Sequence, residues 1–290
     1  MAQGGAITAI PHELGADQFE IVVRKLADDL TYGTDLSRFV GTGVDYAQTR
    51  PFAYGDSVKA IDWRVTARTG KFHIKEYESV KRVGVFIVVD TSASMSVASG
   101  LHTHASKHDY ATWIAGSLAV ACLRRRSPVC LLSCGERDGQ VAPTMSRGQV
   151  WRAIEMLRNP GREERTNVAA ALQRVESLAR NTSAVVLISD LHDPTAVPSI
   201  RRIGQRHDAM VMRVRDPAER RGLGAGFYRG VEAESGREFL GSSRGGFGDS
   251  NEDPLVGSGL DHTTIWTDEA IIPKIAQMLA TRGGVGRTAR

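Results

Sequence analysis

The chain has 290 residues, 41% hydrophobic and 24% charged, so it can form one large domain or two small ones with a substantial core. Its 37 basic and 33 acidic residues leave a net charge of only +4, which gives no reason to expect a nucleic acid partner. No apolar run approaches the roughly 20 residues of a membrane helix, and the first ten residues lack the features of a secretory signal. We therefore expect a cytoplasmic protein without a membrane span, whose three cysteines are reduced core thiols.

The first part of the chain combines a helical pattern with turn-rich sequence. Apolar residues spaced by three and four over 13–32 predict an amphipathic helix. The stretch 33–80 is rich in glycine and in residues that favour strands, and it contains the turn pairs Gly55-Asp56 and Thr69-Gly70. We expect residues 1–80 to form a small helix-plus-β appendage.

From residue 83 the pattern changes to apolar strands alternating with helices. Strands that are apolar throughout are typical of a parallel sheet covered on both faces. The sequence therefore predicts an α/β fold with a doubly wound, mainly parallel sheet in a domain over 81–283, followed by a flexible tail at 284–290. The expected strands are 83–89, 129–134, 184–189 and 209–214, and the expected helices are 106–126, 147–158, 167–180, 195–206 and 268–282, with a hairpin at 228–241.

Oxygen-bearing side chains follow two of these strands. Asp90 ends the first strand and is followed by Ser92 and Ser94, while Asp190 ends another, and Thr166 stands at a helix start. Ligands of doubly wound sheets lie beyond the carboxyl ends of the strands, so these five side chains can converge on one point. Hard oxygen ligands with only two formal charges suit Mg²⁺ or Mn²⁺. The alternative is that each residue only caps a helix or stabilises a turn.

The motif Asp90-Thr91-Ser92-Ala93-Ser94, with Thr166 and Asp190 downstream, resembles the metal-ion-dependent adhesion site of von Willebrand factor A domains. In that family the hydroxyls contact the metal directly, and at least one carboxylate acts through water. One coordination position stays open for an acidic residue of a partner. The resemblance implies the same metal ligands here, in a von Willebrand factor A-like fold.

A second resemblance covers nearly the whole chain. The features Arg50, Tyr54-Gly55-Asp56, Ile61-Asp62-Trp63 and Ala67-Arg68, ahead of the strand that ends in Asp90, are similar to those of a bacterial family known as domain of unknown function 58. The chain resembles the branch without N-terminal membrane helices. This resemblance implies association with MoxR-type AAA+ ATPases as an adaptor or co-chaperone, and it implies no catalytic activity.

Three classes of function compete for the predicted site. The favoured one is a non-enzymatic, Mg²⁺-dependent protein-interaction module that binds an acidic residue of the ATPase or of its client. The alternative is a metal-assisted hydrolase using the same residues, against which the sequence offers no obvious general base and too few carboxylates for two metals. A structural subunit with an empty site is the third class.

Two charged or metal-binding clusters have less specific interpretations. Asp56, Asp62, Arg64 and Arg68 can form either a buried ion-pair lattice or a docking surface. The histidines at 102, 104 and 108 lack a third ligand with suitable spacing, so we interpret them as part of a solvated loop before a helix.

Overall fold

A computed structural model of the chain divides into two compact units, one of Met1–Val40 with Val83–Arg290 and one of Gly41–Arg82. The N-terminal helix therefore belongs with the sheet and not with the turn-rich block that follows it. The structure describes residues 16–33, 45–78, 83–96, 98, 105–134, 142–158, 167–221, 226–231, 238–243 and 254–281; the expected tail at 284–290 lies outside them.

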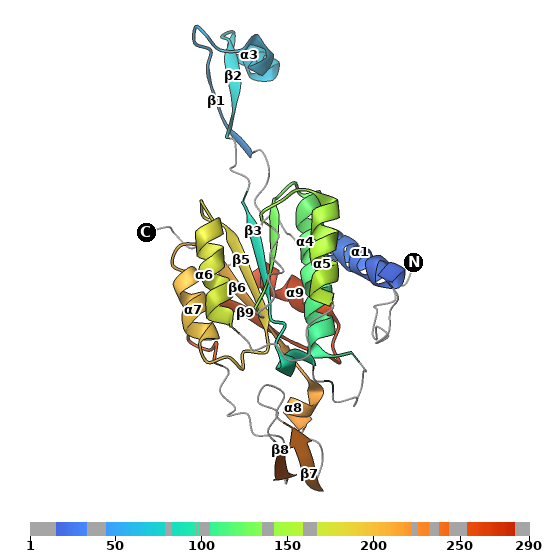
Figure 1. Ribbon diagram of the computed structural model, residues 1–290. Helices are drawn as coiled ribbons and strands as arrows, with labels where there is room; N and C mark the ends of the chain where they lie inside the picture. The colour runs from blue at the N-terminus through green and yellow to red at the C-terminus, as the bar shows by residue number, and fades with distance from the viewer. Residues whose placement is uncertain are drawn as a thin grey trace. The chain divides into compact units, whose positions relative to one another are not determined.

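The larger unit is built on a sheet of five parallel strands in the order β4-β3-β5-β6-β9 (Figure 1). This confirms the predicted α/β fold with a doubly wound sheet. Four strands were expected, and the fifth, β9, was missed because its mostly polar, half-buried residues at the sheet edge lack a continuous apolar run. The strands are β3 (Val85–Val89), β4 (Val129–Ser133), β5 (Ala184–Ser189), β6 (Asp208–Arg215) and β9 (Asp261–Trp266).

Alternate residues of each strand face opposite layers of helices, so both faces of the sheet are buried. In β3, for example, Val85 and Ile87 pack into one core cluster while Phe86 and Val88 pack into the other. The first cluster is covered by α4, α5, α9 and α1, and the second by α6 and α7 (Figure 1). These helices are α1 (Ala16–Gly33), α4 (Lys107–Arg124), α5 (Arg147–Arg158), α6 (Val168–Leu178), α7 (Ala196–Ile203) and α9 (Ile271–Thr281).

Helix α1 forms an outer layer on α4. Its apolar stripe, which includes Val23 and Leu30, is fully buried. The contact is close because α4 carries Gly116 there: a Cβ atom at this position would lie 3.1 Å from Val23 Cγ1. An ion pair between Asp28 and Arg124 joins the two helices at the C-terminal end of α4.

A capping box fixes the start of α4. The Asp109 amide donates to Ser106 Oγ at 3.1 Å, and the Ser106 amide donates to Asp109 Oδ2 at 2.8 Å. Lys107 is therefore held as the first residue of α4. The short helix η2 (Ala93–Ser96) packs against α4.

Between β6 and β9 the chain adds small elements and the expected hairpin. Helix α8 (Pro217–Arg221) follows β6 directly, and β7 (Gly226–Val231) pairs antiparallel with β8 (Glu238–Ser243). All three cysteines are free and buried, as expected. In the part of the chain that the structure describes, no helix is long and apolar enough to cross a membrane.

The unit Gly41–Arg82 is a two-stranded antiparallel ribbon with two short helices. Strand β1 (Asp45–Pro51) pairs with β2 (His73–Glu78), and η1 (Val58–Ala60) and α3 (Trp63–Thr69) lie between them.

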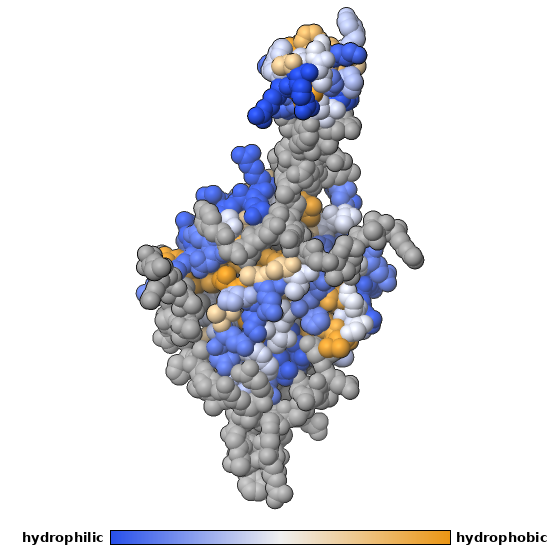
Figure 2. Space-filling view, turned by 180° about the vertical axis from the view of Figure 1, so that it is seen from behind, coloured by the Kyte–Doolittle hydropathy of each residue, from blue (hydrophilic) through white to orange (hydrophobic). Residues whose placement is uncertain are grey.

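Two of the charged residues considered in the sequence make local contacts within this unit. Arg50 binds Asp56 through two hydrogen bonds of 2.8 Å, and Asp62 caps α3 by accepting from the amides of Arg64 and Val65. Several large apolar side chains remain exposed in this unit. Figure 2 shows hydrophobic and hydrophilic residues next to one another on its surface. They are Tyr54, Val58, Trp63 and Phe72.

Candidate functional site

The two expected carboxylates lie at one edge of the sheet, beyond the ends of neighbouring strands. Asp90 follows β3 and Asp190 follows β5, and these strands pair in parallel. The Asp90 amide continues the ladder by donating to the Ile188 carbonyl at 2.9 Å. The parallel pairing thus brings together residues that are far apart in the sequence.

The Asp90 carboxylate is completely buried. Its Oδ1 accepts from the Ser92 amide at 3.0 Å, and its Oδ2 accepts from Ser189 Oγ at 2.6 Å. Burial first, and then the negative charge of Asp190, raises the pKa of Asp90 to about 6. The hydrogen bonds offset only part of this effect, so the site holds a negative charge that its surroundings do not compensate.

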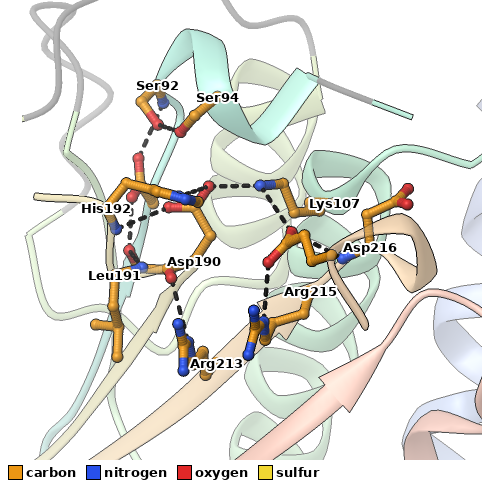
Figure 3. Close-up of polar contacts among 12 residues, drawn as sticks. Ser92, Ser94, Lys107, Asp190, Leu191, His192, Arg213, Arg215 and Asp216 are labelled. Carbon is orange, nitrogen blue, oxygen red and sulfur yellow. Dashed lines mark hydrogen bonds and ion pairs between the residues drawn. The ribbon is translucent and has the colours of Figure 1, made fainter. Parts of the chain in front are cut away.

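Two hydroxyl groups lie beside this carboxylate. Ser92, just before η2, and Ser94, within it, have their Oγ atoms 2.9 Å apart (Figure 3). Ser92 is buried and Ser94 is partly exposed. The turn after β3 therefore presents three hard oxygen donors, one charged and two neutral, next to one another.

Asp190 differs from Asp90 because cationic groups surround it. Its Oδ2 accepts from Lys107 Nζ at 2.7 Å and from His192 Nδ1 at 2.8 Å, and its Oδ1 accepts from the His192 amide at 3.2 Å. Burial alone would raise the pKa of Asp190, but the hydrogen bond from His192 and the charge of Lys107 hold this pKa well below its ordinary range. The bond to Asp190 in turn raises the pKa of His192.

Lys107 connects Asp190 to a second carboxylate. Its Nζ lies 3.4 Å from Glu219 Oε1, and Arg215 Nε lies 2.8 Å from Glu219 Oε2 (Figure 3). Burial would lower the pKa of Lys107, but the charges of Asp190 and Glu219 outweigh burial and raise it. The result is a row of alternating charges formed by Asp190, Lys107, Glu219 and Arg215.

The backbone after β5 is strained where it supports these contacts. Leu191 has a φ of 63°, a left-handed conformation that bulky residues rarely adopt. Its amide donates to Ser189 Oγ at 2.9 Å, the same hydroxyl that binds Asp90. Such a conformation costs about 1–3 kcal/mol and persists only where surrounding contacts fix it.

Sequence reasoning missed four side chains of this site. Three of them depend on tertiary contacts that no local pattern predicts, whereas His192 contacts Asp190, two residues before it. One available signal was a lysine in the first turn of α4, where a positive charge opposes the helix dipole. The missed residues are Lys107, Ser189, His192 and Glu219.

The remaining expected residues have different outcomes. Thr166 lies outside the described residues; its neighbour Asn167 caps α6, and the Asn167 amide binds the Cys134 carbonyl at 2.9 Å, just after β4. His102 and His104 also lie outside the described residues. The expectation of a solvated loop is wrong for His108, which is buried with Nε2 2.6 Å from the Leu157 carbonyl of α5.

The donor set fits a hard divalent cation around Asp90. Within the described ranges no three His, Cys, Asp or Glu side chains cluster as metal ligands. The expected set contains only two carboxylates, so most of its ligands are hydroxyl groups. Asp90, Ser92 and Ser94 have the chemistry that Mg²⁺ prefers, whereas Asp190 already binds an ammonium group.

The fold and this edge define an α/β protein with a polar, carboxylate-centred site at the carboxyl ends of parallel strands. The chain belongs to the family described as "Protein of unknown function DUF58", whose model matches residues 48–242.

The chain is similar to proteins of mycobacteria. Uncharacterized protein Rv1480 of Mycobacterium tuberculosis and uncharacterized protein Mb1516 of Mycobacterium bovis are each 27% identical over 229 residues, which cover 76% of this chain and 71% of theirs. Among solved structures, the RO (RSR) protein of Deinococcus radiodurans is 15% identical with a TM-score of 0.28. That match covers 67% of this chain and 40% of the other, and so distant a likeness carries no argument.

Proposed function

We propose that this protein is a non-enzymatic, Mg²⁺-dependent protein-interaction module. The observation that carries the proposal is the hydroxyl pair of Ser92 and Ser94 beside the buried Asp90 carboxylate, at the sheet edge where Asp190 also lies. Asp90, Ser92 and Ser94 would hold the metal, with Thr166 and Asp190 completing the set.

A metal bound here would supply an electrophilic centre that is only partly neutralised by its ligands. Of the three donors Asp90, Ser92 and Ser94, two are neutral hydroxyls. An incoming carboxylate would therefore be the natural further ligand of the metal. The protein's own residues would fix the position of that contact, because both oxygens of Asp90 are held by hydrogen bonds.

The partner that the family resemblance implies is a MoxR-type AAA+ ATPase or its client, with the protein acting as an adaptor or co-chaperone in the cytoplasm. An aspartate or glutamate of that partner would complete the metal site. The direct test is calorimetric titration of a candidate partner in Mg²⁺ and in EDTA.

The variant that tests the site is Asp90→Ala. Asp28→Ala is its control because Asp28, on α1, pairs with Arg124 at the C-terminal end of α4, the end opposite Lys107. Mg²⁺ at 100 times its dissociation constant should stabilise the wild type by about 2.7 kcal/mol. This gain and partner binding should both disappear in Asp90→Ala and persist in Asp28→Ala. Binding that survives EDTA and Asp90→Ala would instead place the partner elsewhere, for example on the exposed Trp63 and Phe72.

One observation favours the alternative of a metal-assisted hydrolase. His192 binds Asp190 through Nδ1 and its side chain is 56% exposed, so a carboxylate orients this imidazole as it does in many general bases. A panel of phosphate and carboxyl esters tests this function. Mg²⁺-dependent turnover that is lost in His192→Gln would support the hydrolase and contradict the interaction module.

A further inference from the structure

One carboxylate of the candidate site already has a cation. Lys107 Nζ lies 2.7 Å from Asp190 Oδ2, and the two side chains are only 5% and 1% exposed. At this distance and burial the ammonium neutralises Asp190 much as a bound metal ion would. Asp90, on the neighbouring strand, has no ammonium or guanidinium among its described hydrogen-bond and charge partners.

The position of Lys107 is fixed by the fold. The capping box of Ser106 and Asp109 holds its backbone at the start of α4. Glu219 holds the ammonium from the other side at 3.4 Å, and Arg215 in turn holds Glu219. The ammonium therefore cannot leave Asp190 without separating buried charges, which is costly.

We propose that Lys107 is a built-in cation that competes with the divalent metal for Asp190 and so sets the metal affinity of the site. This inference rests on the proposed function. A metal at Asp90, Ser92 and Ser94 is repelled by the ammonium and shares Asp190 with it, so the site binds metal weakly. A carboxylate from a partner restores the missing negative charge, so partner and metal bind together.

The experiment measures Mg²⁺ affinity by calorimetry for the wild type and Lys107→Met, a change that keeps length and removes the charge. Arg124→Met is the matched control, since Arg124 ends the same helix and pairs with Asp28 on the surface. Lys107→Met should bind Mg²⁺ at least tenfold more tightly than the wild type, equivalent to about 1.4 kcal/mol. Arg124→Met should bind Mg²⁺ like the wild type, and Asp90→Ala combined with Lys107→Met should not bind it.

Thermal unfolding in EDTA separates this role from a structural one. A lysine that only stabilises the fold would lower the melting temperature on substitution without improving Mg²⁺ binding. Here the melting temperature in EDTA should fall while Mg²⁺ affinity rises. If Lys107→Met does not fold, Lys107→Gln provides the same test, because its amide can still donate a hydrogen bond to Asp190 without a charge.

Two outcomes overturn the inference in distinguishable ways. Mg²⁺ binding by the wild type that is lost in Asp90→Ala, but unchanged or weaker in Lys107→Met and Lys107→Gln, rejects the competition and leaves the proposed metal site intact. Absence of Mg²⁺ binding in the wild type and in both Lys107 variants rejects the metal site itself, and the inference with it.

Discussion

Replacing Asp90 with asparagine should stabilise the metal-free protein at neutral and alkaline pH. The pKa of Asp90 is about 6, above the ordinary 3.8, because burial and Asp190 disfavour its charged form. A carboxyl group whose folded-state pKa is raised lowers stability once it ionises, so the penalty is absent below pH 3.8 and complete above pH 6. A shift of about two units corresponds to about 3 kcal/mol.

The substitution also has a cost that reduces this gain. The asparagine amide nitrogen, if it replaces Oδ2, cannot accept the hydrogen bond from Ser189 Oγ. A lost hydrogen bond of this kind costs about 1 kcal/mol. We therefore expect Asp90→Asn to be more stable than the wild type by about 2 kcal/mol at pH 8. At pH 5, where the wild-type carboxyl is largely protonated, the gain should shrink by about 1 kcal/mol.

Urea unfolding in EDTA at pH 5 and pH 8 measures this difference. Both proteins retain His192, so its titration cancels when the variant is compared with the wild type at each pH. Asp28→Asn is the control, since the Asp28 side chain is half-exposed and pairs with Arg124. A change in stability that is the same at both pH values, or that is negative at pH 8, would refute the claim that Asp90 is an uncompensated buried charge.

Two further predictions concern the helix layer and the edge of the site. Gly116→Ala should destabilise the protein by about 1–2 kcal/mol in urea, because the new methyl group would press on Val23 at 3.1 Å; Gly148→Ala, with open space in α5, should instead be neutral or stabilising. A stabilising Gly116→Ala would contradict the close packing of α1 on α4. The pKa of His192 is raised by Asp190, so its contribution is complete below about pH 6.5 and lost as pH rises through the raised folded-state pKa. His192→Gln should therefore flatten the fall in stability above pH 6.5, measured by urea unfolding in EDTA.

The main strands could be predicted because the pattern that identifies each strand lies within its own residues. β3 is apolar at every position and β5 at every position before its last, Ser189, a pattern typical of a sheet covered on both faces. β9 pairs with a neighbouring strand along only one of its edges, and its sequence mixes polar and apolar residues. Its pairing with β6 therefore decides its structure more than its own sequence does.

The residues of the candidate site also fall into those that the sequence could predict and those that it could not. Asp90 and Asp190 could be placed together because parallel strands end at one edge of a sheet. Lys107 could not be assigned to them, since the contact joins a helix start to a strand end 83 residues away. The interpretation of His108 was wrong because α4 is enclosed by the sheet, α5 and α1, so its surroundings are buried on nearly all sides.

The outer position of α1 has a consequence for synthesis of the chain. Its apolar stripe, from Phe19 to Leu30, is buried against helices that are made much later, α4 and then α9. At roughly 5–20 residues per second, the roughly 90 residues between Gly33 and Arg124 take about 5–20 s to emerge from the ribosome. During that interval the stripe has no native surface to cover it, and the nascent chain presents a hydrophobic helix to any chaperone that binds such segments.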